Sequence, residues 1–338
     1  MILVTGGTGL VGSHLLFQLL DQDLPIRAIF RRDHKLESVK KVFAYYSEHA
    51  NDLFDKIEWV KADLNDIPAL QDAFNGITHV YHAAAFISFE PNRYRDLKKI
   101  NTEGTANIVN LCISNNIQKL CYVSSIAAIG DEAKPSIKIT EETEWNPEQD
   151  HSVYAITKYG AELEVWRGSQ EGIDTIIINP GIILGPGYWN SGGSGSLFRQ
   201  IHKGMSYYTN GTSAYVDVWD VVSIMIRLME SAIINERFIV ISENIPFKQF
   251  QEKVATALNV KPAQKLAKPF LLAIAWRMDW LNHKLFGKRR KLSKQLANSL
   301  SNMALYDNTK VKQVLNYEFN TIDTSILKVC DLYLRDLN

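Results

Sequence analysis

Cysteine, net charge and long apolar runs are the features that this 338-residue sequence has least of. Its three cysteines, Cys112, Cys121 and Cys330, have no metal-ligand spacing, so we expect reduced thiols and no metal site. The 37 basic and 37 acidic residues cancel, so net charge indicates neither nucleic acid nor an anionic membrane as a partner. No apolar run approaches the roughly 20 residues of a membrane span, and the first residues lack a basic leader. We therefore expect a cytoplasmic protein.

Glycine is concentrated where the chain begins, in the stretch MILVTGGTGLVG. The apolar run Ile2–Val4 predicts a buried strand, and Gly6, Gly9 and Gly12 follow it before a run with helical periodicity. At the first turn of a helix, unpaired N–H groups and the helix dipole favour an anion, and glycine lets a pyrophosphate approach the main chain. The alternative is a glycine turn that only packs helix tightly on strand. The position of the turn favours a dinucleotide, although its spacing differs from G-x-G-x-x-G.

Apolar runs typical of buried strands alternate with helical patterns through the first half of the chain. The runs lie at Ile26–Phe30, Ile57–Val60, His79–His82, Lys119–Val123 and Thr175–Ile178. This alternation predicts an α/β fold, a Rossmann-type doubly wound parallel sheet whose ligands bind at the carboxyl ends of the strands. The dinucleotide-binding domain is predicted at residues 1–179, with 212–236 returning to it. A smaller substrate-binding cap is predicted at 180–211 and 237–338, and Lys35 to Phe54 is expected to be an added surface helix.

Two arginines end the second predicted strand, about twenty residues after the glycine turn. An enzyme that uses NAD commonly places an acidic residue there, on the ribose 2′-hydroxyl. Arg31 and Arg32 fit a 2′-phosphate instead, because a guanidinium can donate two hydrogen bonds to it. The sequence therefore favours NADP over NAD, with a solvated basic loop as the plain alternative.

The pattern Tyr-x-x-x-Lys occurs three times and predicts a proton-transfer pair where it lies on a helix. Residues i and i+4 then lie on one face, and the ammonium can favour the tyrosinate. The pair Tyr154 and Lys158 opens a strong helical run between two predicted strands. We interpret the pairs that begin at Tyr94 and Tyr306 as structural, since one lies in a charged run and the other lies far beyond the sheet. Ser124 and Ser125 end another strand, so their hydroxyls should reach the same edge of the sheet.

These ordered motifs resemble the short-chain dehydrogenase/reductase superfamily, specifically its extended group, the NAD-dependent epimerase/dehydratase family. The resemblance covers most of the chain and rests on Thr5–Gly12, Asp63-Leu64, His82–Ala85, Asn101–Thr105, Ser124-Ser125, Tyr154-x-x-x-Lys158 and Asn179–Pro186. It implies hydride transfer between the nicotinamide and a substrate carbon. It also implies a homodimer through helices that include the one bearing Tyr154.

The resemblance also implies a role for each matching residue. Tyr154 would be the acid/base, Lys158 would hold the nicotinamide ribose and lower the pKa of the tyrosine, and Ser125 would bind the substrate carbonyl, with Ser124 as the fallback. Asn101 completes the catalytic set with a structural or water-organising role, and Phe86 would face the substrate. The implied cofactor-binding residues are Gly6, Thr8, Gly9, Leu10, Val11, Gly12, Arg31, Arg32, Asp63, Leu64, Ala83, Ala84, Ala85, Ser124, Tyr154, Lys158, Pro180, Gly181, Ile182 and Ile183.

Departures from the family pattern reduce the number of reaction classes that this chain is expected to catalyse. Sugar dehydratases carry an acidic pair directly after the catalytic Ser or Thr, but this chain has Ile126 and Ala127, which cannot move a proton. The stretch Asn179–Pro186 is closer to dihydroflavonol reductases and hydroxysteroid dehydrogenases. We therefore expect an NAD(P)-dependent oxidoreductase that interconverts a carbonyl and a secondary alcohol. The alternatives are a nucleotide-sugar epimerase with tightly bound NAD and a non-catalytic dinucleotide sensor.

The sequence also predicts the structure of two further segments. Aspartates in the stretch Tyr215–Val222 should cap a helix rather than catalyse. The apolar, aromatic run from Phe270 to Leu285 precedes a basic run at 288–291. We expect an ordinary cap helix packed on the sheet domain, with peripheral contact to a membrane or a lipid-like substrate as the alternative.

Overall fold

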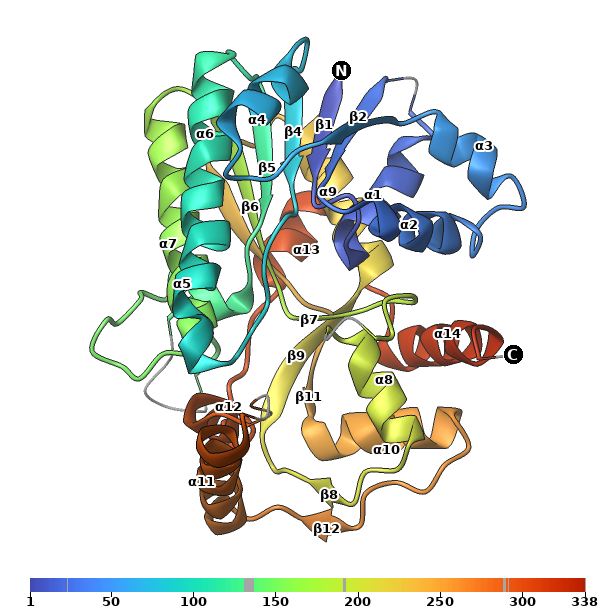
Figure 1. The fold of residues 1–338 in the computed structure, drawn as a ribbon, viewed down its shortest axis with the longest axis vertical. Coiled ribbons are helices and arrows are strands. Elements are labelled where there is room, and N and C mark those ends of the chain that lie inside the picture. Colours follow the sequence, from blue (N-terminus) through green and yellow to red (C-terminus); the bar gives the residue numbers. More distant parts are fainter. Residues whose placement is uncertain (23, 131–136, 191–192, 288–289, 291, 338) are drawn as a thin grey trace.

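The fold is built on one parallel sheet of seven strands (Figure 1). The computed structural model describes residues 1–22, 24–130, 137–190, 193–287, 290 and 292–337. The sheet order is β10-β6-β5-β4-β1-β2-β3. The strands are β1 (Ile2–Thr5), β2 (Ile26–Phe30), β3 (Glu58–Lys61), β4 (His79–His82), β5 (Lys119–Val123), β6 (Asp174–Pro180) and β10 (Glu236–Val240). Strands β2, β4 and β5 have the predicted bounds, and β3 and β6 overlap their predicted runs.

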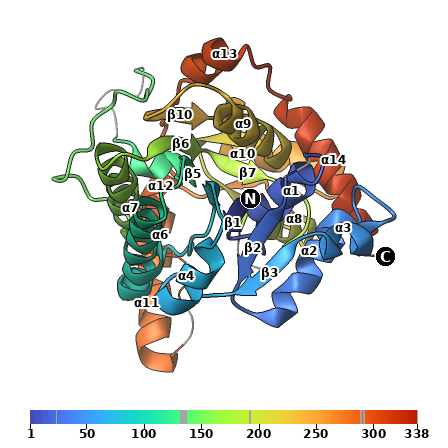
Figure 2. The same cartoon turned by 90° about the horizontal axis from the view of Figure 1, so that it is seen from above.

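Helices cover both faces of this sheet, which confirms the predicted doubly wound architecture (Figure 2). One face packs against α1 (Leu10–Leu19), α2 (Leu36–Phe43), α3 (Ala50–Asp55), α9 (Val218–Glu230) and α13 (Thr309–Leu315). The other packs against α4 (Ile67–Phe74), α6 (Gly104–Ser114) and α7 (Val153–Gln170), with the short α5 (Tyr94–Leu97) beside α7. The order of the strands reverses between β1 and β4, where ligands of such sheets bind.

A smaller unit lies below the carboxyl edge of the sheet (Figure 1). Its three-stranded sheet consists of β7 (Ile182–Leu184), β9 (Thr212–Asp217) and β11 (Glu243–Pro246). The helices α8 (Gly195–His202), α10 (Phe247–Ala257) and α14 (Ile322–Arg335) share a hydrophobic core with it. The segments β8 (Tyr207–Tyr208), β12 (Lys265–Leu266), α11 (Pro269–Phe286) and α12 (Lys294–Ser299) extend it. Strand β10 begins at residue 236, where the predicted return segment ends, and its residues 236–240 lie in the large sheet.

The segment from Lys35 to Phe54 differs from its prediction. It forms the two helices α2 and α3 rather than one, and Phe43 is fully buried instead of lying on the surface. The reason is a helical spacing of apolar side chains, because Val39 and Phe43 pack with Leu15 of α1 in the same core. This insertion is therefore part of the sheet domain's packing.

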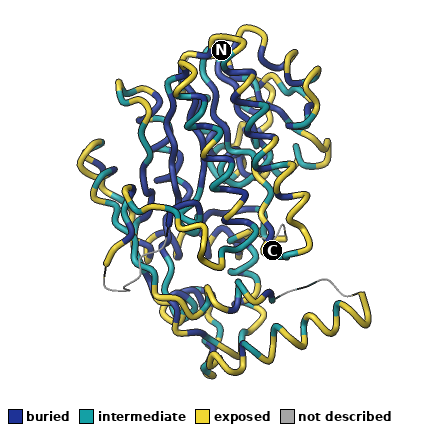
Figure 3. The backbone as a smooth tube through the Cα atoms, turned by 90° about the vertical axis from the view of Figure 1, so that its left-hand side faces the viewer, coloured by how far each residue is buried: buried dark blue, intermediate teal, exposed yellow. Residues whose placement is uncertain are grey.

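Helix α11 also departs from its expected packing on the sheet domain. Leu272 is the buried residue of this 18-residue helix, and eight of its apolar side chains are at least 39% exposed. Figures 2 and 3 show the helix projecting from the body of the molecule. Of the basic run at 288–291, only Arg290 is among the described residues. Within the described part of the chain, no helix is both long and apolar enough to span a membrane.

Candidate active site

The glycine loop lies where β1 meets α1, at the reversal point of the sheet. Gly6 has a φ of +72°, and a side chain on it would collide with the main chain of Ala83 and Ala84. A Cβ on Gly12 would lie 2.2 Å from the carbonyl oxygen of Gly6. These two glycines are thus required by the loop's own packing. Helix α1 has neither a side-chain cap at Gly9 nor an acidic residue in its first turn, so its N-terminus fits the phosphates of a dinucleotide.

A buried histidine ties this loop to the next strand. The ring of His82 contacts the Thr5 hydroxyl at 2.6 Å through Nδ1 and the Thr105 hydroxyl at 2.9 Å through Nε2. The Thr5 hydroxyl also accepts a hydrogen bond from the backbone of Ala84. Burial lowers the pKa of His82 to about 3, so the ring is neutral and connects β1, β4 and α6. The sequence reasoning gave His82 no role, because its two threonine partners are distant in the chain.

The segment after β4 is held by Asn101. Its side chain accepts a 2.7 Å hydrogen bond from the backbone N–H of Phe86 and donates a 3.0 Å bond to the carbonyl of the same residue. It also donates to the Thr157 hydroxyl on α7. Asn101 therefore positions the predicted substrate residue Phe86. Ala83 and Ala84 lie between Phe86 and the glycine loop, while the next residue, Ala85, is exposed.

The two serines that follow β5 point in different directions. Ser124 is buried and its hydroxyl donates a 2.6 Å hydrogen bond to Glu162 of α7. The Ser125 hydroxyl caps the next turn by accepting from the N–H of Ala127, and it lies near enough to the Tyr154 phenol to lower the pKa of that group. The serine that contacts the tyrosine is therefore Ser125, the residue favoured from the sequence for binding a carbonyl.

Tyr154 lies in the first turn of α7, which Ser152 caps by accepting a hydrogen bond from the N–H of Ala155. Burial raises the pKa of Tyr154 to about 12, and the hydrogen bond with Ser125 partly opposes this shift. The phenol is thus protonated at neutral pH and can donate its proton to an oxyanion. Phe89 packs edge-on against the tyrosine ring, with 5.6 Å between the ring centroids. The sequence did not indicate a role for Phe89.

Lys158 lies one turn further along α7 and is fully buried. Its ammonium donates to the Tyr122 hydroxyl at 2.6 Å and to the Val123 carbonyl at 2.9 Å. Burial lowers the pKa of Lys158 to about 7, and the negative charge of Glu162 opposes that shift. The lysine lies beneath the end of β5, and the lowering of the tyrosine pKa by Lys158 stays a prediction.

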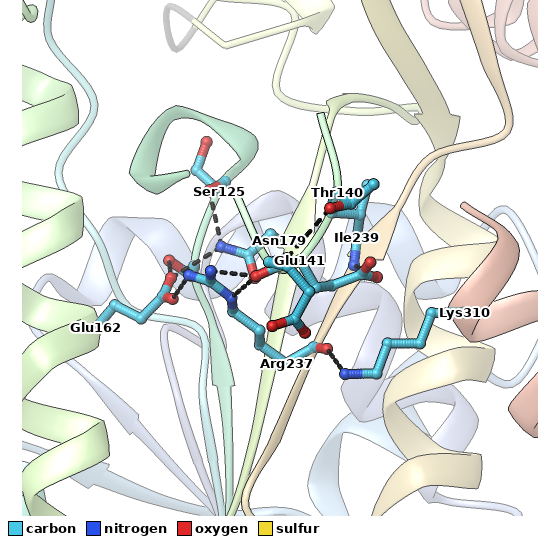
Figure 4. Close-up of polar contacts among 10 residues, drawn as sticks. Ser125, Thr140, Glu141, Glu162, Asn179, Arg237, Ile239 and Lys310 are labelled. Carbon is cyan, nitrogen blue, oxygen red and sulfur yellow. Dashed lines mark hydrogen bonds and ion pairs between the residues drawn. The ribbon is translucent and has the colours of Figure 1, made fainter. Parts of the chain in front are cut away.

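Glu162 joins the site to a buried polar network (Figure 4). Besides the Ser124 hydroxyl, it accepts hydrogen bonds from Asn179 at 2.8 Å and from Arg237 at 3.2 Å. Asn179 also donates to the Ser125 carbonyl. Arg237 additionally donates to the carbonyl of Glu141. The network holds the ends of β5 and β6 together, and Glu162 and Arg237 were not among the sequence-predicted site residues.

Arg31 and Arg32 follow β2 at the same edge of the sheet, beside the Asp63-Leu64 pair that follows β3. The Arg31 guanidinium forms an ion pair with Asp63 at 3.3 Å, and Arg32 is exposed. Asp63 also accepts a hydrogen bond from the N–H of Asn65. The Leu64 carbonyl accepts from Asn107 of α6. The structure brings these residues together along the edge where the adenosine half of a dinucleotide would extend from the glycine loop.

The stretch from Pro180 to Ile183 crosses from the large sheet to the small one. A Cβ on Gly181 would lie 2.4 Å from the Ala214 carbonyl, so β6 and β9 approach closely there. The next loop returns to the dinucleotide loop, because Gly185 lies against the Leu10 side chain. The Asp217 side chain caps α9 by accepting from the N–H of Asp220, which confirms the predicted capping role.

A cavity of about 570 Å³ lies next to the serine and tyrosine segments. Its walls come from residues adjacent to Ser125 and Tyr154 and from α11 and α12. The apolar lining includes Ile126, Ile129, Ala155, Leu272, Ala273 and Trp276. The rest of the lining is polar and includes Asp150, His151, Asn298, Ser301 and Asn302, so the cap and the sheet domain share a pocket with both apolar and polar walls.

Residues 2–241 match the family model of the NAD-dependent epimerase/dehydratase family. This chain belongs to that family. Sterol demethylase protein B of Methylococcus capsulatus, a family relative, is 27% identical over 290 residues, which cover 85% of this chain and 84% of the relative. Cinnamoyl-CoA reductase 1 of Petunia hybrida is 27% identical over 249 residues, or 71% of this chain and 72% of the reductase. The crystal structure of gox2253 superposes with a TM-score of 0.82 at 23% identity, covering 99% of this chain and 98% of that one. That last likeness shows the shared fold.

Proposed function

We propose that this chain is an NAD(P)-dependent oxidoreductase that interconverts a carbonyl and a secondary alcohol, with Tyr154 as the acid/base. The observation that carries the proposal is that the Ser125 hydroxyl lies near the Tyr154 phenol at the carboxyl end of β5, where it lowers the pKa that burial raises. Two fixed hydroxyls of this kind can stabilise the charge that develops on a carbonyl oxygen without reorganising. The raised pKa of Tyr154 keeps the proton available for reduction.

A dinucleotide held there would be the source or the acceptor of the hydride, and the chain's own residues would bind it and move the proton. The N-terminus of α1 would hold the phosphates, and Lys158 would hold the nicotinamide ribose. In reduction, Tyr154 donates its phenolic proton to the substrate oxygen while Ser125 hydrogen-bonds that oxygen. In oxidation the proton returns to Tyr154. Asn101 positions Phe86 beside the reacting groups, as its two hydrogen bonds to that residue support.

We infer that the preferred cofactor is NADP. Because Asp63 already holds the Arg31 guanidinium, Arg32 is the exposed cation that can reach a 2′-phosphate. Arg31 then forms the side of that site and keeps Asp63 oriented. The 2′-phosphate gains a charge-assisted hydrogen bond that a 2′-hydroxyl cannot provide.

The substrate that fits is bulky and has a large apolar part. The cavity next to the Ser125 and Tyr154 segments has an apolar side formed by Ile126, Leu272 and Trp276 and a polar side from α12 and the residues after it, and no acidic pair follows the serines. The size of the cavity, about 570 Å³, suits a molecule with several rings or a long chain. Relatives named for sterol demethylation and cinnamoyl-CoA reduction are consistent with such substrates.

We also infer a homodimer through α7. Ile156 and Leu163, seven residues apart on this helix, are 42% and 49% exposed, so they lie on one apolar side of it. Leu163→Glu would place a charge in that interface. Light scattering should then show monomer where the wild type is dimeric.

The test of the reaction class begins with the nucleotide that accompanies the purified protein. We expect little nucleotide to be released on denaturation, and calorimetry of stripped protein to show tighter binding of NADPH than of NADH. Wild-type protein should then oxidise NADPH in the presence of bulky apolar ketones or aldehydes. Retained NAD with turnover of a nucleotide sugar would replace the proposal with an epimerase. Dinucleotide binding without turnover of either class would indicate a sensor.

A further inference from the structure

Helix α11 carries a continuous apolar stripe on its outer side. Phe270, Ile274, Met278, Leu281 and Leu285 follow one another at three- or four-residue steps, so they line one face of the helix. Their exposed fractions range from 39% for Leu281 to 72% for Phe270. Isolated exposed apolar residues are ordinary, but five on one face form a surface that marks an interaction site.

The orientation of this stripe is fixed by the opposite face of the helix. Leu272 and Trp276 face the cavity that α11 shares with the sheet domain and α12. Asp279 continues this inner face and is held by Arg290 at 3.3 Å. Helix α11 therefore has two apolar faces, of which the inner one lines the cavity and the outer one is exposed. The helix itself projects from the body of the molecule (Figures 2 and 3).

The surroundings of the stripe are basic, although the whole chain has no net charge. Between Lys265 and Gly287 the sequence has four basic residues and one acidic residue, Asp279, which pairs with Arg290. Arg277 and Lys284 are exposed and flank the stripe on the same edge of the helix. A partner for this surface must therefore be apolar where the stripe lies and anionic around it.

We propose that α11 docks this protein on the surface of a bilayer that contains anionic lipids. An apolar stripe flanked by Arg and Lys, with Trp280 near its edge, is the pattern of a helix that lies in the membrane interface. The helix has 18 residues and is thus about 27 Å long, enough to lie along the interface with its stripe among the acyl chains. Because the inner face lines the cavity, docking would bring that cavity close to the bilayer. The inference rests on this surface and is independent of the reaction.

The test is co-sedimentation of the full chain with vesicles of phosphatidylcholine, alone or mixed with phosphatidylserine. We expect binding to the mixed vesicles that weakens as salt is raised, and far weaker binding to phosphatidylcholine alone. The double variant Ile274→Gln/Leu281→Gln removes apolar contact while keeping good helix formers, and should weaken binding by at least about tenfold. The variant Arg277→Gln/Lys284→Gln should weaken binding to the mixed vesicles only.

The matched control is Leu327→Gln on α14, which replaces a leucine that is 62% exposed elsewhere on the surface. It should bind vesicles as the wild type does, and all variants should keep the wild-type melting temperature. Equal sedimentation of wild type and the Ile274→Gln/Leu281→Gln variant would overturn the proposal. So would absence of binding together with a self-association that only this double variant abolishes, because the stripe would then be covered by a second copy of the chain.

Discussion

The Ser124 hydroxyl donates a 2.6 Å hydrogen bond to the Glu162 carboxylate beneath the candidate site. Glu162 also opposes the burial that lowers the pKa of Lys158 to about 7. One carboxylate therefore orients the end of β5 and favours the charged form of a lysine that is buried without an ion pair to Glu162. Glu162 therefore has a positioning role. The pH dependence of activity in a Glu162 variant distinguishes this role from a direct part in catalysis.

Glu162→Gln should move the activity profile toward lower pH. Without the negative charge the pKa of Lys158 falls further, so the ammonium is lost at a lower pH and activity at pH 8 drops more than activity at pH 6. The measurement is kcat/KM across that range. Glu164→Gln, on the same helix but paired with Arg167 near the surface, serves as the control and should leave the profile in place. A uniform loss of activity at all pH values in Glu162→Gln would indicate a structural role alone.

Replacing Ser125 should lower activity, whereas replacing Ser124 should lower stability. Ser125→Ala removes the hydroxyl that lies near Tyr154, so kcat should fall by about 10²-fold, as expected for loss of one oxyanion donor. Ser124→Ala leaves Glu162 with one donor fewer and should cost about 1–3 kcal/mol of unfolding free energy. Steady-state kinetics and chemical denaturation of both variants check this. The reverse assignment of the two effects would make Ser124 the substrate-binding hydroxyl.

Arg32→Ala should weaken NADPH binding by about tenfold or more while changing NADH binding little, because only NADPH has the 2′-phosphate. Arg31→Ala should have a smaller selective effect, since that guanidinium already pairs with Asp63. Calorimetric titration of both variants with both dinucleotides is the measurement. Equal losses for NADPH and NADH would mean that the arginines stabilise the loop rather than bind phosphate.

Stability should depend on pH through a buried carboxylate in the return segment. Burial, and then repulsion from Asp217, raises the pKa of Asp220 from 3.8 to about 7. The folded chain thus binds more protons than the unfolded chain between these values, so the unfolding free energy falls as pH rises through this window. In Asp220→Asn, the fall in unfolding free energy between pH 5 and pH 8 should be smaller than in the wild type by roughly 1–2 kcal/mol. Urea denaturation across pH measures it, with the exposed Asp72→Asn as a control that should keep the wild-type slope.

Local sequence patterns predicted the large sheet well. Strands such as Lys119–Val123 are short apolar runs between turn signals, and the glycine loop indicates the end of the first strand and the start of α1. The same reasoning selected Tyr154 and Lys158 over the other two tyrosine–lysine pairs. In the structure Tyr94 is 40% exposed, and Lys310 binds Glu236 instead of a catalytic group.

Contacts between distant segments account for what the sequence did not predict. Arg237 reaches Glu162 across 75 positions of the chain, and His82 reaches Thr5 across 77, so neither pairing has a local signature. Periodicity showed that α11 is apolar but not that it has two apolar faces. Only the packing of the inner face reveals that the outer face is uncovered among the described residues.

The most direct measurement is turnover and dinucleotide affinity of Tyr154→Phe in one preparation, with a carbonyl substrate that the wild type reduces. The variant keeps the ring that packs on Phe89 but loses the phenolic hydroxyl, and with it the proton near Ser125. We predict that kcat falls by about 10²–10⁴-fold while the Kd for NADPH stays within about threefold of wild type. Full turnover in Tyr154→Phe would contradict the assignment of Tyr154 as the proton donor.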